Sequence, residues 1–193
     1  MPEKNSADVS AILQKQKTAK PKMEEVIPEY LDGEMRKTAL DFAAFLRAEK
    51  TPPVWTLANA WKAAYKGKAL CYIRMPRGPF DNQFDQKGMP AGDRSRNFWV
   101  VTLYLEHLDE YEQTIANEGL RELVWGNLYH CNNCHPGRCA PGVDRTILGR
   151  NINNLCCGRP PVWLWNPGEA AIAGIKRLLE LEKKARADDA KKV

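Results

Sequence analysis

A cluster of cysteines in the C-terminal third of the chain most restricts how this protein can fold. Five of its six cysteines lie between residues 131 and 157, in a segment rich in Gly, Pro and Asn. They are Cys131, Cys134, Cys139, Cys156 and Cys157. Burial alone rarely concentrates so many thiols among polar residues. We therefore expect a Cys-rich loop lobe over residues 128–160 that is held together through its sulfur atoms.

The spacing within this cluster predicts a structural zinc site. Cys131 and Cys134 form a C-x2-C pair, which places two thiolates on one edge of a tetrahedral centre. Cys139 can fold back as a third ligand, and one of the last two cysteines supplies the fourth. The alternate ligands within the segment are His130 and His135.

Other thiol chemistries fit the same residues. An iron–sulfur cluster uses cysteine thiolates, and Cys131 to His135 also satisfies C-x-x-C-H, the motif for covalent haem attachment. A thiol-based redox or metal sensor is the main alternative function, because a C-x-x-C pair can exchange with a disulfide. The sequence leaves open whether the cysteines hold a metal, form disulfides or remain as thiols.

The charge distribution is compatible with a third function, nucleic-acid binding by a nucleic-acid-binding module. The formal net charge is +5, and basic residues also gather around the cysteines. They are Arg138, Arg145, Arg150 and Arg159. A basic patch permits contact with phosphates, although most such residues simply solvate a surface.

The sequence also restricts the compartment. It contains no apolar run long enough for a signal peptide or a membrane span. We therefore expect a cytoplasmic protein with no membrane partner, and in the cytosol cysteines more often serve metal ligation or redox chemistry than disulfide frameworks.

Hydrophobic periodicity predicts an α+β fold. Apolar residues at three- and four-residue steps indicate a helix over Leu31–Glu49, and Asn166 begins a C-terminal helix with a capping box. Helical segments are also expected in the central region, at Asp109–Asn117 and Leu120–Asn127. The predicted strands are Trp61–Tyr65, Ala69–Met75 and Phe98–Leu105. They form a small antiparallel sheet of about three strands, packed by the N-terminal, central and C-terminal helices.

The expected organisation is one domain with two tails. Residues 1–27 are Lys-rich and aperiodic, which predicts a mobile N-terminal arm, and residues 184–193 read as a charged C-terminal tail. A single domain covers residues 28–183 and includes the Cys-rich lobe. The long segment 76–97 between the second and third strands is either a flap or disordered.

Alternation along the strands separates a core face from an exposed face. Cys71 falls on the core side and is expected to act as a small buried hydrophobe. The opposite side carries Tyr72, Arg74 and Tyr104, a mixed aromatic and polar face suited to a small ligand or a partner protein. His107, just after the third strand, is expected at the surface or core edge and not as a ligand.

One stretch of the sequence resembles a known group of domains. It is the run WKAAYKGKALCYI, which contains Trp61, Lys62, Tyr65, Gly67 and Lys68, and YEQTI follows it after a further strand. Over residues 35–125 this pattern resembles small uncharacterised bacterial YdhG-like α+β domains. The resemblance implies a compact α+β fold with a small-ligand cleft on the exposed sheet face. Neither it nor the sequence contributes a catalytic motif, which favours a non-enzymatic role.

Overall fold

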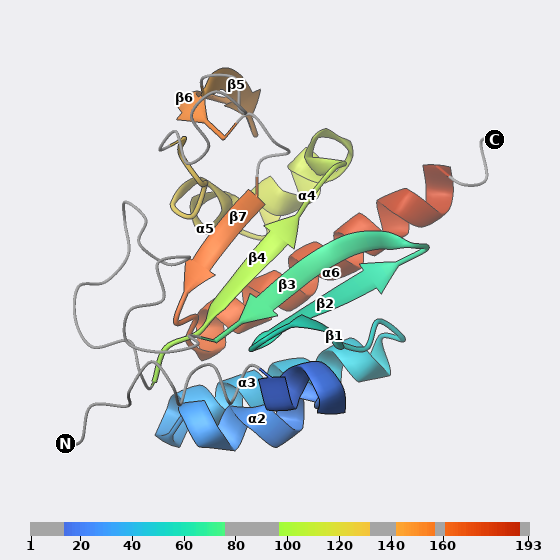
Figure 1. Cartoon of the computed structure of the whole chain (residues 1–193). Helices are drawn as coiled ribbons and strands as arrows, with labels where there is room; N and C mark the ends of the chain where they lie inside the picture. Colours follow the sequence, from blue (N-terminus) through green and yellow to red (C-terminus); the bar gives the residue numbers. More distant parts are fainter. Residues whose placement is uncertain (1–13, 76–96, 132–141, 157–160, 190–193) are drawn as a thin grey trace. The chain divides into compact units, whose positions relative to one another are not determined.

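The computed structural model describes residues 14–75, 97–131, 142–156 and 161–189 (Figure 1). The chain divides into two compact units. The first unit consists of residues 1–101 and 165–169, and the second unit consists of residues 102–164 and 170–193.

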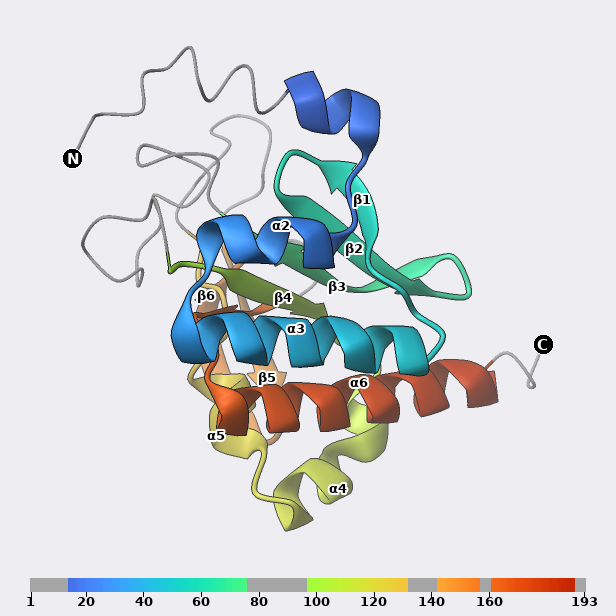
Figure 2. The same ribbon diagram turned by 90° about the horizontal axis from the view of Figure 1, so that it is seen from below.

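The first unit begins with two helices and three strands. Its elements are α2 (Met23–Tyr30), α3 (Gly33–Ala48), β1 (Val54–Leu57), β2 (Ala60–Tyr65) and β3 (Lys68–Arg74). The two helices lie side by side in both views (Figures 1 and 2). A tight turn joins β2 to β3, and both Lys66 (φ 49°) and Gly67 (φ 78°) adopt left-handed backbone there. Two such residues in succession suit the twist of a two-residue hairpin.

Large aromatic side chains fill the core of the first unit. Trp61, Trp99 and Phe42 are fully buried, and the rings of Phe42 and Trp99 lie 6.4 Å apart between centroids. The indole N–H of Trp61 donates a hydrogen bond to the carbonyl of Pro21 over 2.9 Å. The predicted core side of β3 is buried, since Cys71 and Ile73 are completely buried, but Leu70 on the opposite side is completely buried as well.

The second unit contains most of the remaining elements. They are η2 (Leu108–Tyr111), α4 (Glu112–Asn117), α5 (Arg121–Trp125), β5 (Val143–Ile147), β6 (Arg150–Leu155), β7 (Pro161–Trp165) and α6 (Glu169–Asp189). Strand β4 (Val100–Tyr104) crosses the boundary between the units, and both β7 and α6 have one end residue in the first unit. In α6, a Cβ added at Gly174 would lie 2.5 Å from the Cδ2 atom of Leu123 in α5. This glycine therefore permits close packing of the two helices.

The α+β class is confirmed, but the prediction of about three strands is wrong. The main sheet has five strands in the order β1-β2-β3-β4-β7, and β5 and β6 form a separate two-stranded sheet. The short strand β1 was missed because its four residues, VWTL, show no alternation of apolar and polar side chains. The prolines before β7 favoured extended backbone without indicating that it pairs in a sheet.

The predicted loop lobe is also corrected where the structure describes it. Residues 143–155 form an antiparallel hairpin, with Ile147 paired to Arg150. Leu148 (φ 50°) and Gly149 (φ 75°) make its turn, and Ile147 and Ile152 bury their side chains. Mostly polar residues on both strands hid this hairpin from periodicity analysis. Residues 132–141 and 157–160 of the predicted lobe lie outside the described residues.

Both predicted tails contribute ordered, buried residues. Within the segment expected to be an arm, residues 14–19 are helical and α2 buries Met23, Val26 and Ile27. At the other end, α6 continues to Asp189 and buries Ala185 and Arg186. Residues 1–13, 76–96 and 190–193 lie outside the described residues. Within the described ranges, no helix is both long and apolar enough to cross a membrane.

Candidate functional site

Backbone pairing brings the two cysteine-bearing segments of the second unit together. The amide of Cys131 donates to the carbonyl of Asn154 over 2.7 Å, and the amide of Cys156 donates to the carbonyl of Tyr129 over 3.1 Å. These two bonds flank an antiparallel bridge between His130 and Leu155. The first cysteine of the C-x2-C pair is therefore anchored beside the strand end that leads to Cys156.

This register determines which side chains share a face. Successive residues of an extended chain point to opposite faces, and residues opposite one another across a bridge point to the same face. His130 and Leu155 therefore share one face, whereas Cys131 and Cys156 share the other face as diagonal neighbours. Each cysteine is half-buried.

Gly142 allows close packing beside this pair. A Cβ at Gly142 would lie 2.7 Å from the Cβ of Cys131 and 2.1 Å from the side-chain oxygen of Asn154. No side chain fits that space unless its neighbours move. Because glycine has no side chain, the backbone just before β5 can lie close to Cys131 and Asn154. The remaining predicted metal ligands, Cys134, Cys139, Cys157 and His135, lie outside the described residues.

The sixth cysteine lies in a different environment. Cys71 is fully buried in β3, and burial raises the pKa of its thiol to about 12. Because the thiolate is the reactive species, we expect Cys71 to resist iodoacetamide at pH 8 in the folded protein and to react once urea unfolds the chain. Peptide mass mapping of the alkylated protein measures this directly. Rapid modification of native Cys71 would contradict the expectation.

The residues of the predicted ligand face are placed as follows. Tyr72 and Arg74 lie in β3 of the first unit, half-buried, with the Arg74 guanidinium carbon 5.7 Å from the centroid of the Tyr72 ring. Tyr104 ends β4 in the second unit, and its carbonyl accepts a hydrogen bond from Arg186 over 2.9 Å. The side chains of Tyr72 and Arg74 therefore contact each other, while Tyr104 has its backbone engaged elsewhere.

A buried polar network occupies the core of the second unit. Glu182 of α6 is completely buried and accepts hydrogen bonds at both carboxylate oxygens. Its Oε2 atom accepts from the Tyr111 hydroxyl (2.7 Å) and the His107 amide (3.2 Å), and its Oε1 atom accepts from Arg186 Nε (2.7 Å). The ring atom Nδ1 of His107 lies 2.9 Å from the same Oε1. A buried carboxylate requires such partners, because desolvation would otherwise be too costly.

This network fixes the hydrogen-bonding state of its members. Burial raises the pKa of the Tyr111 hydroxyl, and the adjacent Glu182 charge raises it further, so the hydroxyl keeps its proton and donates. An ionised carboxylate can only accept, which makes His107 Nδ1 a donor. The other ring nitrogen, Nε2, then faces outward and lies 2.9 Å from Oδ2 of Asp189.

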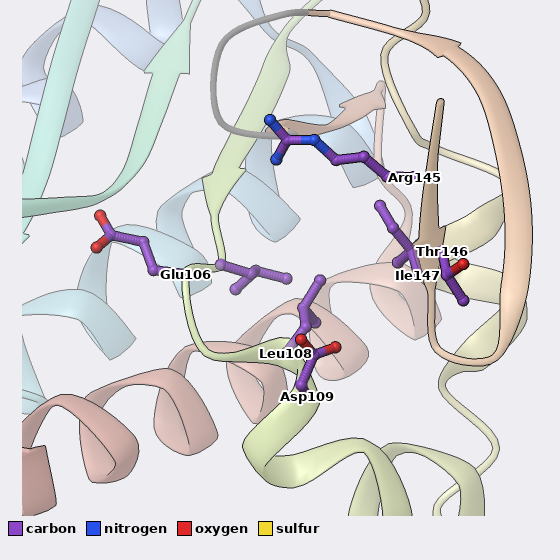
Figure 3. Close-up of a pocket in the computed structure, with 7 residues that line it drawn as sticks. Glu106, Leu108, Asp109, Arg145, Thr146 and Ile147 are labelled. Atoms are coloured by element: carbon purple, nitrogen blue, oxygen red, sulfur yellow. The ribbon is translucent and has the colours of Figure 1, made fainter. Parts of the chain in front are cut away.

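A pocket of about 360 Å³ adjoins this region (Figure 3). Its lining combines buried apolar residues with charged ones from the segment after β4 and from β5. The lining residues are Leu105, Glu106, Leu108, Asp109, Arg145, Thr146 and Ile147. In Figure 3, Arg145 extends from β5 along one side of the pocket, with Leu108 on the opposite side. Such a mixture of apolar and charged groups suits a small ligand that carries charge of its own.

The arginines expected to bind nucleic acid are only partly described. Arg145 lines the pocket, and Arg150 stacks on Trp125 with its guanidinium carbon 5.5 Å from the ring centroid. The indole N–H of Trp125 donates to the Ile147 carbonyl over 2.8 Å, which holds the ring in place. Arg138 and Arg159 lie outside the described residues.

Sequence reasoning missed the buried network, although its signal is present. The apolar stripe of α6 runs through Leu178 and Leu179, and helical spacing carries the same stripe to Glu182 and then to Arg186. Two opposite charges four residues apart on a core face indicate a buried ion pair. His107 was expected at the core edge, and 14% of its side chain is exposed.

Comparison with known proteins adds no relative to these observations. No protein-family model, no curated protein and no solved structure matches this chain.

Proposed function

We propose that this protein is a zinc-binding domain in which cysteines from two distant segments hold one structural ion. The ligands are Cys131 and Cys156 together with Cys134 and Cys139 of the first segment. The ion would fasten the C-x2-C segment to the end of β6. The role is non-enzymatic, and the pocket of the second unit serves a small ligand (Figure 3).

The single observation that supports this proposal is the register between residues 129–131 and 154–156. Two of the five clustered cysteines lie on the same face of that ladder, although 25 positions separate them in the sequence. Zinc sites are commonly built in this way, from a C-x2-C turn and thiolates of a second segment. The register also favours Cys156 over Cys157 as the ligand from the second segment.

Metal analysis of full-length protein purified without a tag tests the proposal. We expect about one equivalent of zinc in the unsubstituted protein, as one tetrahedral site requires. Cys131→Ser and Cys156→Ser each remove a ligand, so each variant should retain well under half of that content. A chelator should also lower the melting temperature of the unsubstituted protein, because metal binding contributes to folding free energy.

Two matched variants control for nonspecific effects. Cys71→Ala removes a cysteine remote in sequence from the cluster, and His130→Ala removes an alternate ligand that lies on the opposite face of the ladder; both should keep the full zinc content. A zinc content near zero in the unsubstituted protein, with the cluster thiols freely titratable, would overturn the proposal. Loss of zinc in His130→Ala but not in Cys156→Ser would overturn the ligand assignment.

The same register supports a second candidate function, a thiol redox switch. Diagonal neighbours on one face of a ladder are about 7–8 Å apart, so a disulfide between Cys131 and Cys156 would require a shift of the backbone. This candidate predicts metal-free protein whose titratable thiols fall by two on mild oxidation and return on reduction. Thiol counting before and after oxidation therefore separates the two functions.

A further inference from the structure

We propose that His107, Glu110 and Asp189 form a second cation site, specific for a divalent ion that prefers nitrogen and oxygen ligands, such as Mn²⁺. One donor atom from each of the three residues lies within 4.8 Å of the other two. The site lies in the second unit, shares no residue with the cysteine cluster, and does not depend on zinc binding there.

Local backbone geometry places His107 and Glu110 on the same side of the chain. His107 is the N-cap of η2, and Glu110 follows it three positions later within that 3₁₀ turn. Side chains three residues apart eclipse one another in a 3₁₀ helix. Asp189 reaches the same position from the last residue of α6.

The buried network orients the histidine for this role. Glu182 accepts the Nδ1 proton of His107, so in the neutral ring the Nε2 atom carries a lone pair directed at the Asp189 carboxylate, 2.9 Å away. A cation between these two atoms would be held by a lone pair from each, in competition with a proton on Nε2. A carboxylate bonded to the far nitrogen of a histidine is also the usual outer support of a metal-ligating imidazole.

The separation of the donors fits an octahedral ion. Two ligands at right angles, each about 2.1 Å from the ion, are about 3 Å apart, and His107 Nε2 and Asp189 Oδ2 match this spacing. Glu110 is exposed and 43% of the Asp189 side chain is exposed, so water can complete the coordination. One imidazole with carboxylates and water suits Mn²⁺ better than thiophilic ions.

The surrounding charges favour a cation. Asp109 is exposed on the same segment as His107 and adds negative charge near the site, whereas Glu106 pairs with Arg186 over 3.7 Å. The nearby Arg186 is already engaged, since it donates to Glu182 and to the Tyr104 carbonyl. Its guanidinium nitrogens are thus shared among Glu182, the Tyr104 carbonyl and Glu106.

Titration of the full-length protein with Mn²⁺, followed by electron paramagnetic resonance of the free ion, tests the inference. We expect one saturable site. Asp189→Asn and Glu110→Gln should each weaken binding at least about tenfold, because each removes a charged ligand. Both residues are partly or fully exposed, so the variants are expected to fold, which circular dichroism checks.

Asp109→Asn is the matched control. It removes one exposed negative charge next to Glu110 without removing a ligand, and it should change affinity less than twofold. Equal weakening in Asp109→Asn and Glu110→Gln would overturn the site in favour of general electrostatic attraction. Absence of saturable Mn²⁺ binding would overturn it in favour of a protonated His107 held between two carboxylates. Cys131→Ser should leave Mn²⁺ binding unchanged, which distinguishes this site from the proposed zinc site.

Discussion

Replacing Glu182 by Gln should destabilise the protein by about 3 kcal/mol or more, because breaking one side of a buried ion pair leaves the other charge uncompensated. Glu182 is completely buried and the Arg186 side chain is only 4% exposed. The amide would also turn its NH₂ group toward donors that now share a carboxylate. Urea denaturation of the variant and the unsubstituted protein measures the difference in the free energy of unfolding.

Two further variants define the cause of this loss. Glu180→Gln lies on the same helix with its side chain 44% exposed, and it pairs with Arg177 over 3.2 Å. An exposed pair contributes only about 0–1 kcal/mol, so this control should change little. Replacing both Glu182 and Arg186 by Met should recover part of the stability lost in Glu182→Gln, because both charges of the buried pair are removed together, although Tyr111 and Glu106 each lose a partner. Equal stabilities for Glu182→Gln and Glu180→Gln would show that the network contributes nothing.

Truncating Trp99 to Ala should lower the free energy of unfolding by about 3–5 kcal/mol, the range for a large aromatic residue removed from a packed core. Trp99 is fully buried and packs against Phe42 of α3. The backbone of Trp99 is fixed by Asn166, whose side-chain oxygen accepts from the Trp99 amide (2.8 Å) and whose amide donates to the Trp99 carbonyl (2.9 Å). Thermal and urea denaturation provide the measurement.

Trp99→Phe separates ring packing from hydrogen bonding. Among the described residues, the indole N–H of Trp99 has no hydrogen-bond acceptor. Phe therefore loses part of the buried area without losing a bond, and its cost should be clearly smaller than that of Ala. Val54→Ala, at a position that is 59% exposed, should change stability by less than about 0.5 kcal/mol. A Trp99→Ala variant as stable as Val54→Ala would contradict the placement of Trp99 in the core.

Elements with strong, local patterns could be predicted from the sequence. The α3 helix shows three- and four-residue spacing, and the alternation in β3 identified Cys71 as a buried residue. The turn at Lys66 and Gly67 follows from the backbone freedom of glycine. Each of these features depends on residues a few positions apart, which is why a linear pattern records them.

Elements stabilised by distant partners were not predictable in the same way. The β5-β6 hairpin carries few apolar residues, and its pairing depends on the Leu148-Gly149 turn and two buried isoleucines. The described part of the predicted arm, residues 14–27, was taken as mobile because it is Lys-rich and its apolar residues show no clear periodicity. Met23, Val26 and Ile27 are buried because other parts of the first unit cover them.

In the cysteine cluster, too, some features follow from the local sequence and others depend on contacts between distant residues. By itself the sequence determined that five thiols are concentrated within residues 131–157, together with the C-x2-C spacing of the first pair. The tertiary structure decided that Cys131 and Cys156 share a face, because backbone hydrogen bonds between residues far apart in the chain set the register. It also decided that His107, Glu182 and Asp189 meet. Helix α6 brings two carboxylates to a histidine more than 70 residues away, and no local spacing encodes that encounter.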